Sequence, residues 1–280
     1  ACAGAGTCSV TMDVARSVTA TFALEPRTLT VARVGTGTGT VTGAGITCGS
    51  DCAETVGQGT SITLTATPSS TPATASTFVG WSGACSGTGS CTVVLTSSTS
   101  VTAEFRLAPN LMFVSSVAFT GNLGGLAGAD AKCQALAAGA NLAGTYRAYL
   151  SSIDGNTLIT AASRMGSASG WVRVDGATVM NAVTQLASGG LANPPQLTEA
   201  GSDVGQSQTP FAWTGTNPAG TFDSTCTNST VFTPWGGTSS SAMVGAATST
   251  SSAVVALGAA DCASAMRLYC LGIDRSAIAP

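Results

Sequence analysis

Apolar and polar positions alternate in short runs through the first hundred residues, and glycine-rich stretches separate the runs. In residues 61–66 the apolar positions are Ile62, Leu64 and Ala66, and residues 101–105 show the same period of two. Such alternation in segments rich in threonine and valine predicts half-buried β-strands. We therefore expect the N-terminal region to be all-β.

This region also contains an internal repeat. Residues 1–24 and 84–107 are identical at 12 of 24 positions without a gap, and Cys2 and Cys8 align with Cys85 and Cys91. A recurrence of this length indicates a repeated structural unit. We expect a truncated β repeat at residues 1–25, so that the chain begins inside a repeat unit, and a complete small β repeat at residues 27–107.

The pattern changes after residue 110. Residues 125–138 carry apolar side chains at spacings of three and four, which predicts an amphipathic helix with Cys133 on its buried face. The other expectations are strands at 111–119, 146–150, 171–174 and 266–273, a helical turn at 179–186, a buried segment at 211–215 and a long loop at 225–252. This mixture predicts an α+β domain over residues 111–274, followed by a tail at 275–280.

Charge is scarce and excludes several functions. Lys and Arg number 10 and Asp and Glu 13, so charged residues make up 8% of the chain and the net charge is -3. A chain without a basic excess offers nothing to a nucleic-acid backbone. The chain has no histidine, which removes histidine-based catalysis and histidine metal sites. No apolar run is long enough to span a membrane. We expect no cofactor, no metal, no nucleic-acid partner and no membrane span.

Ten cysteines predict disulfides and an extracellular or cell-surface location. Short spacings favour the local pairs Cys2–Cys8, Cys48–Cys52 and Cys85–Cys91. The last four cysteines allow three pairings. An early helix carries Cys133 and the last strand carries Cys270, so we favour a nested arrangement that joins Cys133 to Cys270 and Cys226 to Cys262.

Several motifs of the complete repeat point to a known family. The runs LTVARVGTGTGTVTG, ITCGSDC, TLTATP, FVGWSGACSGTGSC and SVTAEF resemble the divergent internalin-type repeats of bacterial surface proteins. The resemblance covers about residues 27–107 and the truncated copy before it. It implies small β-rich modules strung in tandem, with a spacer or adhesion role and no chemistry.

The second region resembles another family. The runs CQALAAGANLAGTYRAYLSS, VRVDGATVMNAVTQLASG, AWTGTNPAGTFDSTC and GAADCASAMRLYC resemble the endostatin domain of collagens and its bacterial relatives. This likeness implies a C-type-lectin-like fold: a twisted antiparallel sheet, a flanking helix, a long loop and the nested disulfides. The histidines of the endostatin zinc site are missing here. Of the arginine cluster that binds heparin in endostatin, this sequence has Arg147 and Arg164 near the matching motifs.

The candidate ligand-binding residues lie in and before the long loop. Trp235 can stack on a sugar or a partner side chain, or it can pin the loop to the body of the domain. Asn217 and Asp223 lie in the segment that leads into the loop, but they do not form a calcium-lectin motif. Hard cations need several clustered oxygen ligands, and Asp223 has no acidic neighbour, so we expect no calcium site.

These observations predict a non-catalytic bacterial surface or secreted protein. A repeat stalk would carry a lectin-like adhesion domain that binds an extracellular protein or glycan. The first alternative is a self-assembling extracellular fibre or matrix subunit, because apolar strands of the half repeat could complete a second copy. The second alternative is a hydrolase with a carboxylate pair. Its candidates are separate in sequence, and the sequence leaves open whether two of them meet: Asp154, Asp175, Glu199, Asp203 and Asp223.

Overall fold

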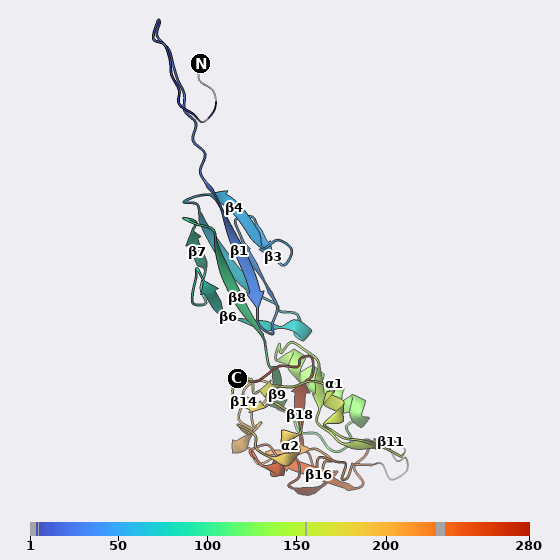
Figure 1. Ribbon diagram of the computed structural model, residues 1–280. Helices are drawn as coiled ribbons and strands as arrows, with labels where there is room; N and C mark the ends of the chain where they lie inside the picture. Colours follow the sequence, from blue (N-terminus) through green and yellow to red (C-terminus); the bar gives the residue numbers. More distant parts are fainter. Residues whose placement is uncertain (1–3, 5, 155, 228–232) are drawn as a thin grey trace. The chain divides into compact units, whose positions relative to one another are not determined.

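The computed structural model describes residues 4, 6–154, 156–227 and 233–280. It falls into two compact units (Figure 1). The first comprises Ala1–Val34, Thr40–Thr67 and Phe78–Glu104, and the second comprises Gly35–Gly39, Pro68–Thr77 and Phe105–Pro280.

The first unit is built on two small four-stranded sheets. A few terminal residues of β2, β5, β6 and β8 fall in the second unit by this division. One sheet has the order β4-β1-β8-β6 and the other has the order β3-β2-β5-β7. Strands β1 and β8 pair in parallel, whereas β5 and β7 pair antiparallel. The bounds are β1 Pro26–Val34, β2 Gly39–Gly43, β3 Ile46–Cys48, β4 Ala53–Gly57, β5 Ser61–Pro68, β6 Ser76–Gly83, β7 Cys91–Val94 and β8 Thr99–Leu107, with a 3-10 turn η1 at Pro72–Thr74.

The apolar members of the alternating runs form the core of these sheets. Ile62 and Leu64 of β5 and Val101 and Ala103 of β8 are all fully buried, while their polar neighbours are more exposed. This confirms the all-β expectation and the period-two assignment of these strands. No strand is found between residues 6 and 25 of the described chain, where the aligned copy has β7 and β8.

The second unit is built on a sheet with the order β14-β13-β9-β18-β15-β16-β17, and β10 also pairs with β18. Strand β9 (Asn110–Val114) and strand β18 (Arg267–Gly272) are antiparallel neighbours at its centre. The remaining strands are β10 Tyr146–Ala148, β13 Trp171–Val172, β14 Thr178–Met180, β15 Phe211–Trp213, β16 Ser241–Ala246 and β17 Gly258–Asp261, with a separate hairpin of β11 Ser152–Asp154 and β12 Thr157–Ile159.

Both faces of the central strands are buried, so successive side chains enter two different cores. Met112 of β9 and Tyr269 of β18 belong to one core, whereas Phe113 and Cys270 belong to the other. A strand covered on both faces reads as a continuous apolar run. This explains why the two central strands stand out in the sequence as MFV and LYCL.

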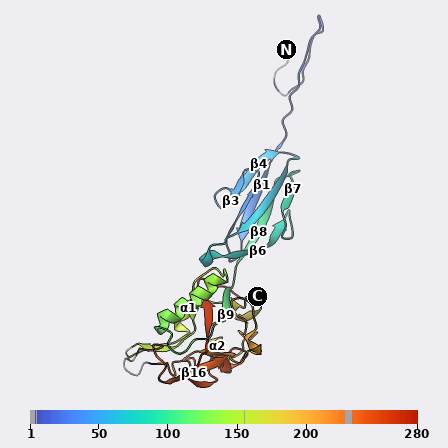
Figure 2. The ribbon, with the colours of Figure 1, turned by 180° about the vertical axis from the view of Figure 1, so that it is seen from behind.

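Each of the two cores contains side chains from one helix. Helix α1 (Gly125–Gly139) packs beside β10 and β18, and Figure 2 shows α1 and β18 side by side from behind as Figure 1 does from the front. The short helix α2 (Gln185–Ser188) contributes Leu186 and Ala187 to the other core. The remaining turns are the 3-10 segments η2 Ser163–Met165, η3 Val204–Gln206 and η4 Ser252–Val254.

Four disulfides are described in the two units, and they match the predicted pairs. The local pairs are Cys48–Cys52 and Cys85–Cys91. The nested pairs are Cys133–Cys270, with Cα atoms 5.4 Å apart, and Cys226–Cys262, with Cα atoms 5.6 Å apart. Cys8 is also disulfide-bonded, while its expected partner Cys2 lies outside the described residues.

Two sequence assignments in the second unit are wrong. The segment expected to be a helical turn at 179–186 splits into strand β14 and the later helix α2, because the turn at Gly176, with a φ of 86°, folds β14 back onto β13. The expected long loop at 225–252 contains strand β16. Small residues hide this strand, since two of its three buried positions are Ala242 and Gly245.

Candidate functional site

Trp235 lies in the interior of the second unit. Its side chain is 0% exposed, and its indole Nε1–H donates a hydrogen bond to the Ser151 carbonyl at 2.9 Å. Its backbone N–H donates to Thr225 Oγ1 at 3.0 Å. The ring therefore fastens the loop to the body of the unit, and it presents no surface on which a ligand could stack.

Asn217 organises the turn that follows β15. Its Oδ1 accepts hydrogen bonds from the backbone N–H groups of Ala219 at 3.0 Å and Thr221 at 3.1 Å, and its Nδ2 donates to Thr221 Oγ1 at 2.7 Å. A side-chain amide that bonds to nearby backbone groups fixes a turn. Asn217 thus holds the turn in shape, and the residues it positions are Pro218, Ala219 and Gly220.

Asp223 is exposed, and its Oδ1 accepts a hydrogen bond from Ser224 Oγ at 2.8 Å. It lines neither of the hollows described below. Among the described residues, no group of three or more Cys, Asp or Glu side chains is placed to hold a metal ion.

The Asn217 turn forms one wall of a hollow of about 390 Å³. Helix α2 and its N-cap form another wall with Thr184, Ala187 and Ser188, and Ala162 and Tyr149 complete the lining. The walls approach closely at Gly220, where an added Cβ would lie 3.1 Å from the Cβ of Ala187. None of the described residues that line this hollow is charged.

Tyr149, which lines the hollow, has a buried hydroxyl group without a hydrogen-bond partner among the described residues. The side chain is 1% exposed. Burial raises the pKa of this phenol well above its usual range, so the hydroxyl stays neutral and can donate or accept a hydrogen bond. A buried polar group without a partner is costly and is seldom left so.

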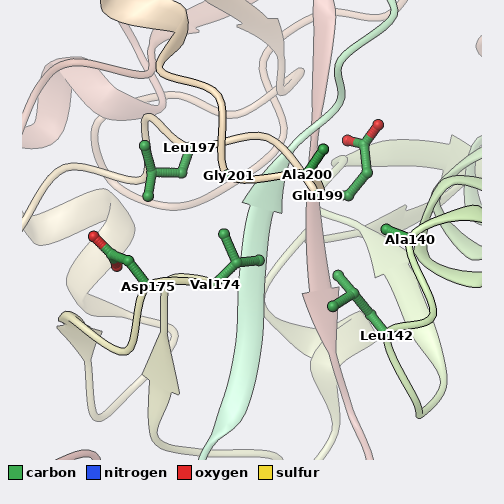
Figure 3. A pocket seen from close by; sticks show the side chains of 8 residues that line it. All are labelled: Ala140, Leu142, Val174, Asp175, Leu197, Glu199, Ala200 and Gly201. Atoms are coloured by element: carbon green, nitrogen blue, oxygen red, sulfur yellow. The ribbon is translucent and has the colours of Figure 1, made fainter.

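A second, shallower groove of about 450 Å³ lies between the end of α1 and two turns of the sheet. Figure 3 shows its apolar floor of Leu142, Val174 and Leu197, with Asp175 and Glu199 at its two ends. The two carboxylates point away from each other and away from the floor of the groove (Figure 3).

Both carboxylates of this groove are engaged by their own chain. Arg173 binds Asp175 through Nε at 3.1 Å and Nη2 at 2.7 Å, and this hydrogen bonding lowers the pKa of Asp175. The backbone N–H of Ser116 donates to Glu199 Oε2 at 3.0 Å, and the Ser116 hydroxyl donates to Glu199 Oε1. The structure thus brings two of the five candidate carboxylates to one groove, but as ligands of neighbouring groups and not as a facing pair.

The two arginines that the sequence analysis considered for anion binding also contact their own chain. The Arg164 side chain is 8% exposed and binds both oxygens of Asp130 on α1, at 2.6 and 2.7 Å. The Arg147 guanidinium donates to the Arg164 carbonyl at 2.6 Å. The Arg164 guanidinium is therefore neutralised by Asp130 and is not a free anion-binding group.

The hollow itself was not predicted from the sequence. Its lining comes from Tyr149, Ala162, residues 184–188 and residues 218–220, which are separate in the chain. No motif joins these segments. Only the turn at Asn217 carried a signal, because Asn-Pro followed by Ala-Gly is typical of a turn.

The comparisons with known proteins concern the first unit. Residues 29–109 match the family described as the divergent InlB B-repeat domain. A search of curated proteins found no match. The match indicates a bacterial surface repeat protein, and the disulfides are consistent with an extracellular one. None of the described helices is both long and apolar enough to cross a membrane.

Proposed function

We propose that this chain is part of a non-catalytic bacterial surface protein, in which a repeat module carries an endostatin-like, C-type-lectin-like domain that binds an uncharged, hydroxyl-bearing ligand such as a neutral glycan. The repeat match supports the surface role. The mixed sheet, the flanking helix and the nested disulfides support the endostatin-like likeness of the second unit.

The observation that carries the ligand class is the uncharged lining of the hollow. The hydroxyl residues Thr184 and Ser188 at the two ends of α2 and walls of alanine and proline suit a ligand with hydroxyl groups and a small apolar face. An anionic ligand finds no cation in this lining. Because the Arg164 guanidinium is paired with Asp130, it is not available to bind a sulfate group, and a sulfated glycan is a weaker candidate than a neutral one.

The test uses the full chain and a panel of neutral glycans, sulfated glycans and matrix proteins. Ala162→Leu places a larger side chain in the hollow, and Ala140→Leu does the same in the groove of Figure 3. We expect binding of a neutral glycan to fall about tenfold or more in A162L and to persist in A140L. Equal binding by both variants and the parent, or binding of sulfated glycans alone, would contradict the proposal.

Tyr149→Phe is the control variant for the hollow. It removes a hydroxyl that has no partner among the described residues, so the free energy of unfolding should stay level or rise. Glycan binding should be unchanged, because the buried hydroxyl has no surface that a ligand in the hollow can contact. Weaker binding at unchanged stability would mean that the hydroxyl contacts the ligand.

A second candidate function is a subunit of a self-assembling extracellular fibre or matrix. The supporting observation is the set of exposed apolar side chains in residues 6–25, of which Phe22 is 91% exposed. Sedimentation velocity over a wide range of protein concentration tests it. A chain that stays monomeric at the highest concentration is not a self-assembling subunit.

A further inference from the structure

Glu199 is a buried carboxylate whose charge is not balanced by a cation of the described residues. It is 8% exposed, and its two oxygens accept hydrogen bonds from the backbone N–H of Ser116 at 3.0 Å and from the Ser116 hydroxyl, which are both neutral donors. The ion pairs among the described residues do not include it. The Arg267 guanidinium donates to the carbonyls of Ser115 and Ser116 and not to this carboxylate. Because buried charges in proteins are normally paired, this position favours a cationic ligand.

The rest of the groove in Figure 3 is apolar or already balanced in charge. Asp175, at the other end, is bound by Nε and Nη2 of Arg173, so its charge is compensated. Between the two carboxylates lie the apolar side chains of Leu142, Val174 and Leu197. The groove therefore combines a floor that suits an aliphatic chain with one uncompensated negative charge at its Glu199 end.

We propose that this groove binds a lysine side chain of a partner polypeptide. The aliphatic stem of the lysine lies along the apolar floor, and its ammonium group donates a hydrogen bond to the Glu199 carboxylate at the end of the groove. A lysine side chain suits both parts of the site, since it packs its stem on apolar surface and places its charged head in a polar setting. The site is separate from the hollow at Tyr149, and the inference does not depend on the glycan proposed there.

The hydrogen bonds of Glu199 favour an ammonium over a guanidinium group. Each carboxylate oxygen already accepts a hydrogen bond from Ser116. The planar fork of an arginine binds best when both oxygens are open to it, whereas an ammonium is a compact point charge that needs only one. The site therefore selects lysine.

The lysine comes from another protein and not from a second copy of this chain. The chain has one lysine, Lys132. Its Nζ donates to the Leu123 carbonyl at 3.2 Å and lies over the ring of Phe119, 5.5 Å from the ring centroid. A second copy would have to break these contacts to offer its ammonium group, whereas an exposed lysine of a partner is free to bind.

The binding test uses the isotope-labelled full chain and the blocked peptide Gly-Gly-Lys-Gly-Gly as the probe. Nuclear magnetic resonance should show shifts of the backbone amides of residues 140–142, 174–175 and 197–201, with a Kd on the order of 1 mM for a single side chain. Matched peptides carry arginine, norleucine or acetyl-lysine in place of lysine, and each should bind at least about fivefold more weakly. Absence of these shifts at about 10 mM peptide overturns the proposal, and so does equal binding of any matched peptide.

Glu199→Gln tests the charge. It removes a buried charge without a counter-ion and keeps the shape of the side chain, so stability should stay level or rise while binding of the lysine peptide falls about tenfold. Asp223→Asn is the control, since Asp223 is an exposed carboxylate outside the groove and should leave peptide binding unchanged. Equal binding by the two variants overturns the proposal. A loss of stability in E199Q with unchanged peptide binding also overturns it, because Glu199 then serves the fold.

A pair of filling variants separates this site from the hollow. Ala140→Leu narrows the groove and should abolish binding of the lysine peptide, while Ala162→Leu narrows the hollow and should leave it unchanged. Binding of a neutral glycan should show the opposite pattern. Failure of the glycan arm alone therefore contradicts the proposed function, whereas lysine-peptide binding that persists in A140L overturns the present inference.

Discussion

Trp235 lies edge-on to Trp213, with ring centroids 6.0 Å apart and ring planes inclined at 60°. Both side chains are fully buried. The Trp213 indole N–H donates to the Phe119 carbonyl at 2.8 Å, and that of Trp235 donates to the Ser151 carbonyl. The pair therefore links the loop after Cys226 to the segments around Phe119 and Ser151, and it stabilises the conformation of the loop.

Removing the Trp235 ring should destabilise the second unit. We expect Trp235→Ala to lower the free energy of unfolding by about 3–5 kcal/mol, as large aromatic truncations in cores do. Trp235→Phe should cost less, because it keeps a ring but leaves the Ser151 carbonyl without its donor. Urea denaturation followed by circular dichroism measures both. Val117→Ala, at a position 49% exposed, is the control and should change stability by less than about 0.5 kcal/mol.

The disulfides should differ in their contribution to stability. Cys133–Cys270 spans a separation of 137 residues, whereas Cys48–Cys52 spans 4. A longer closed loop restricts the unfolded chain more, so replacing both cysteines of the long pair by alanine should cost on the order of 4–5 kcal/mol, and those of the short pair less than about 3 kcal/mol. Thermal unfolding of the two double variants gives the comparison. A larger loss for the short pair would show that loop length is not the controlling factor here.

The second unit should lose stability in strong alkali. The three tyrosines of the chain all lie in it, and burial raises the pKa of Tyr146 to about 12 and that of Tyr149 and Tyr269 further. The unfolded chain releases these protons near pH 10, while the folded unit retains them. Stability is therefore full below pH 10 and declines as pH rises through 12, by about 1.4 kcal/mol per tyrosine and pH unit.

Ultraviolet absorbance of tyrosinate follows this transition. Ionisation should coincide with loss of near-ultraviolet circular dichroism, because the phenols ionise when the unit opens. The first unit has no tyrosine and provides the internal reference. Phenol titration near pH 10 in a unit that stays folded would show that the rings are not buried.

The ion pair between Arg164 and Asp130 should contribute more than the one between Arg173 and Asp175. The Arg164 side chain is 8% exposed, and the backbone N–H of Ala148 also donates to Asp130. Asp130→Asn should cost about 1–3 kcal/mol, because a buried guanidinium loses its counter-charge. Asp175→Asn should cost less than about 1 kcal/mol, because the Asp175 side chain is 44% exposed and the pair is screened by solvent. Urea denaturation at low and high salt should show a larger salt effect for the exposed pair.

The sequence predicted those parts of the fold in which local pattern and tertiary burial agree. Helix α1 appears where the apolar spacing placed it, and Cys133 on its predicted inner face bonds to Cys270. The period-two runs around Leu64 and Val101 became strands. In each case the side chains that define the pattern are also the ones that the core covers.

Other elements were missed because tertiary contacts, and not local pattern, define them. Strand β16 reads as a polar loop, since its buried positions Ala242 and Gly245 carry little or no side chain. An added Cβ at Gly245 would lie 1.8 Å from the Val254 carbonyl oxygen, so close packing selects glycine there. The hollow at Tyr149 likewise depends on four separate parts of the chain, which no local spacing records.

The bond between Cys133 and Cys270 also determines how the second unit carries a mechanical load. Strands β9 and β18 are antiparallel, with Met112 opposite Leu271, so a pull on the two ends of the unit separates them one hydrogen bond at a time. At Cys270 the force passes through the disulfide to Cys133 of α1. The residues between the two cysteines then bear no tension, so further extension is confined to the segment before Cys133, which contains β9.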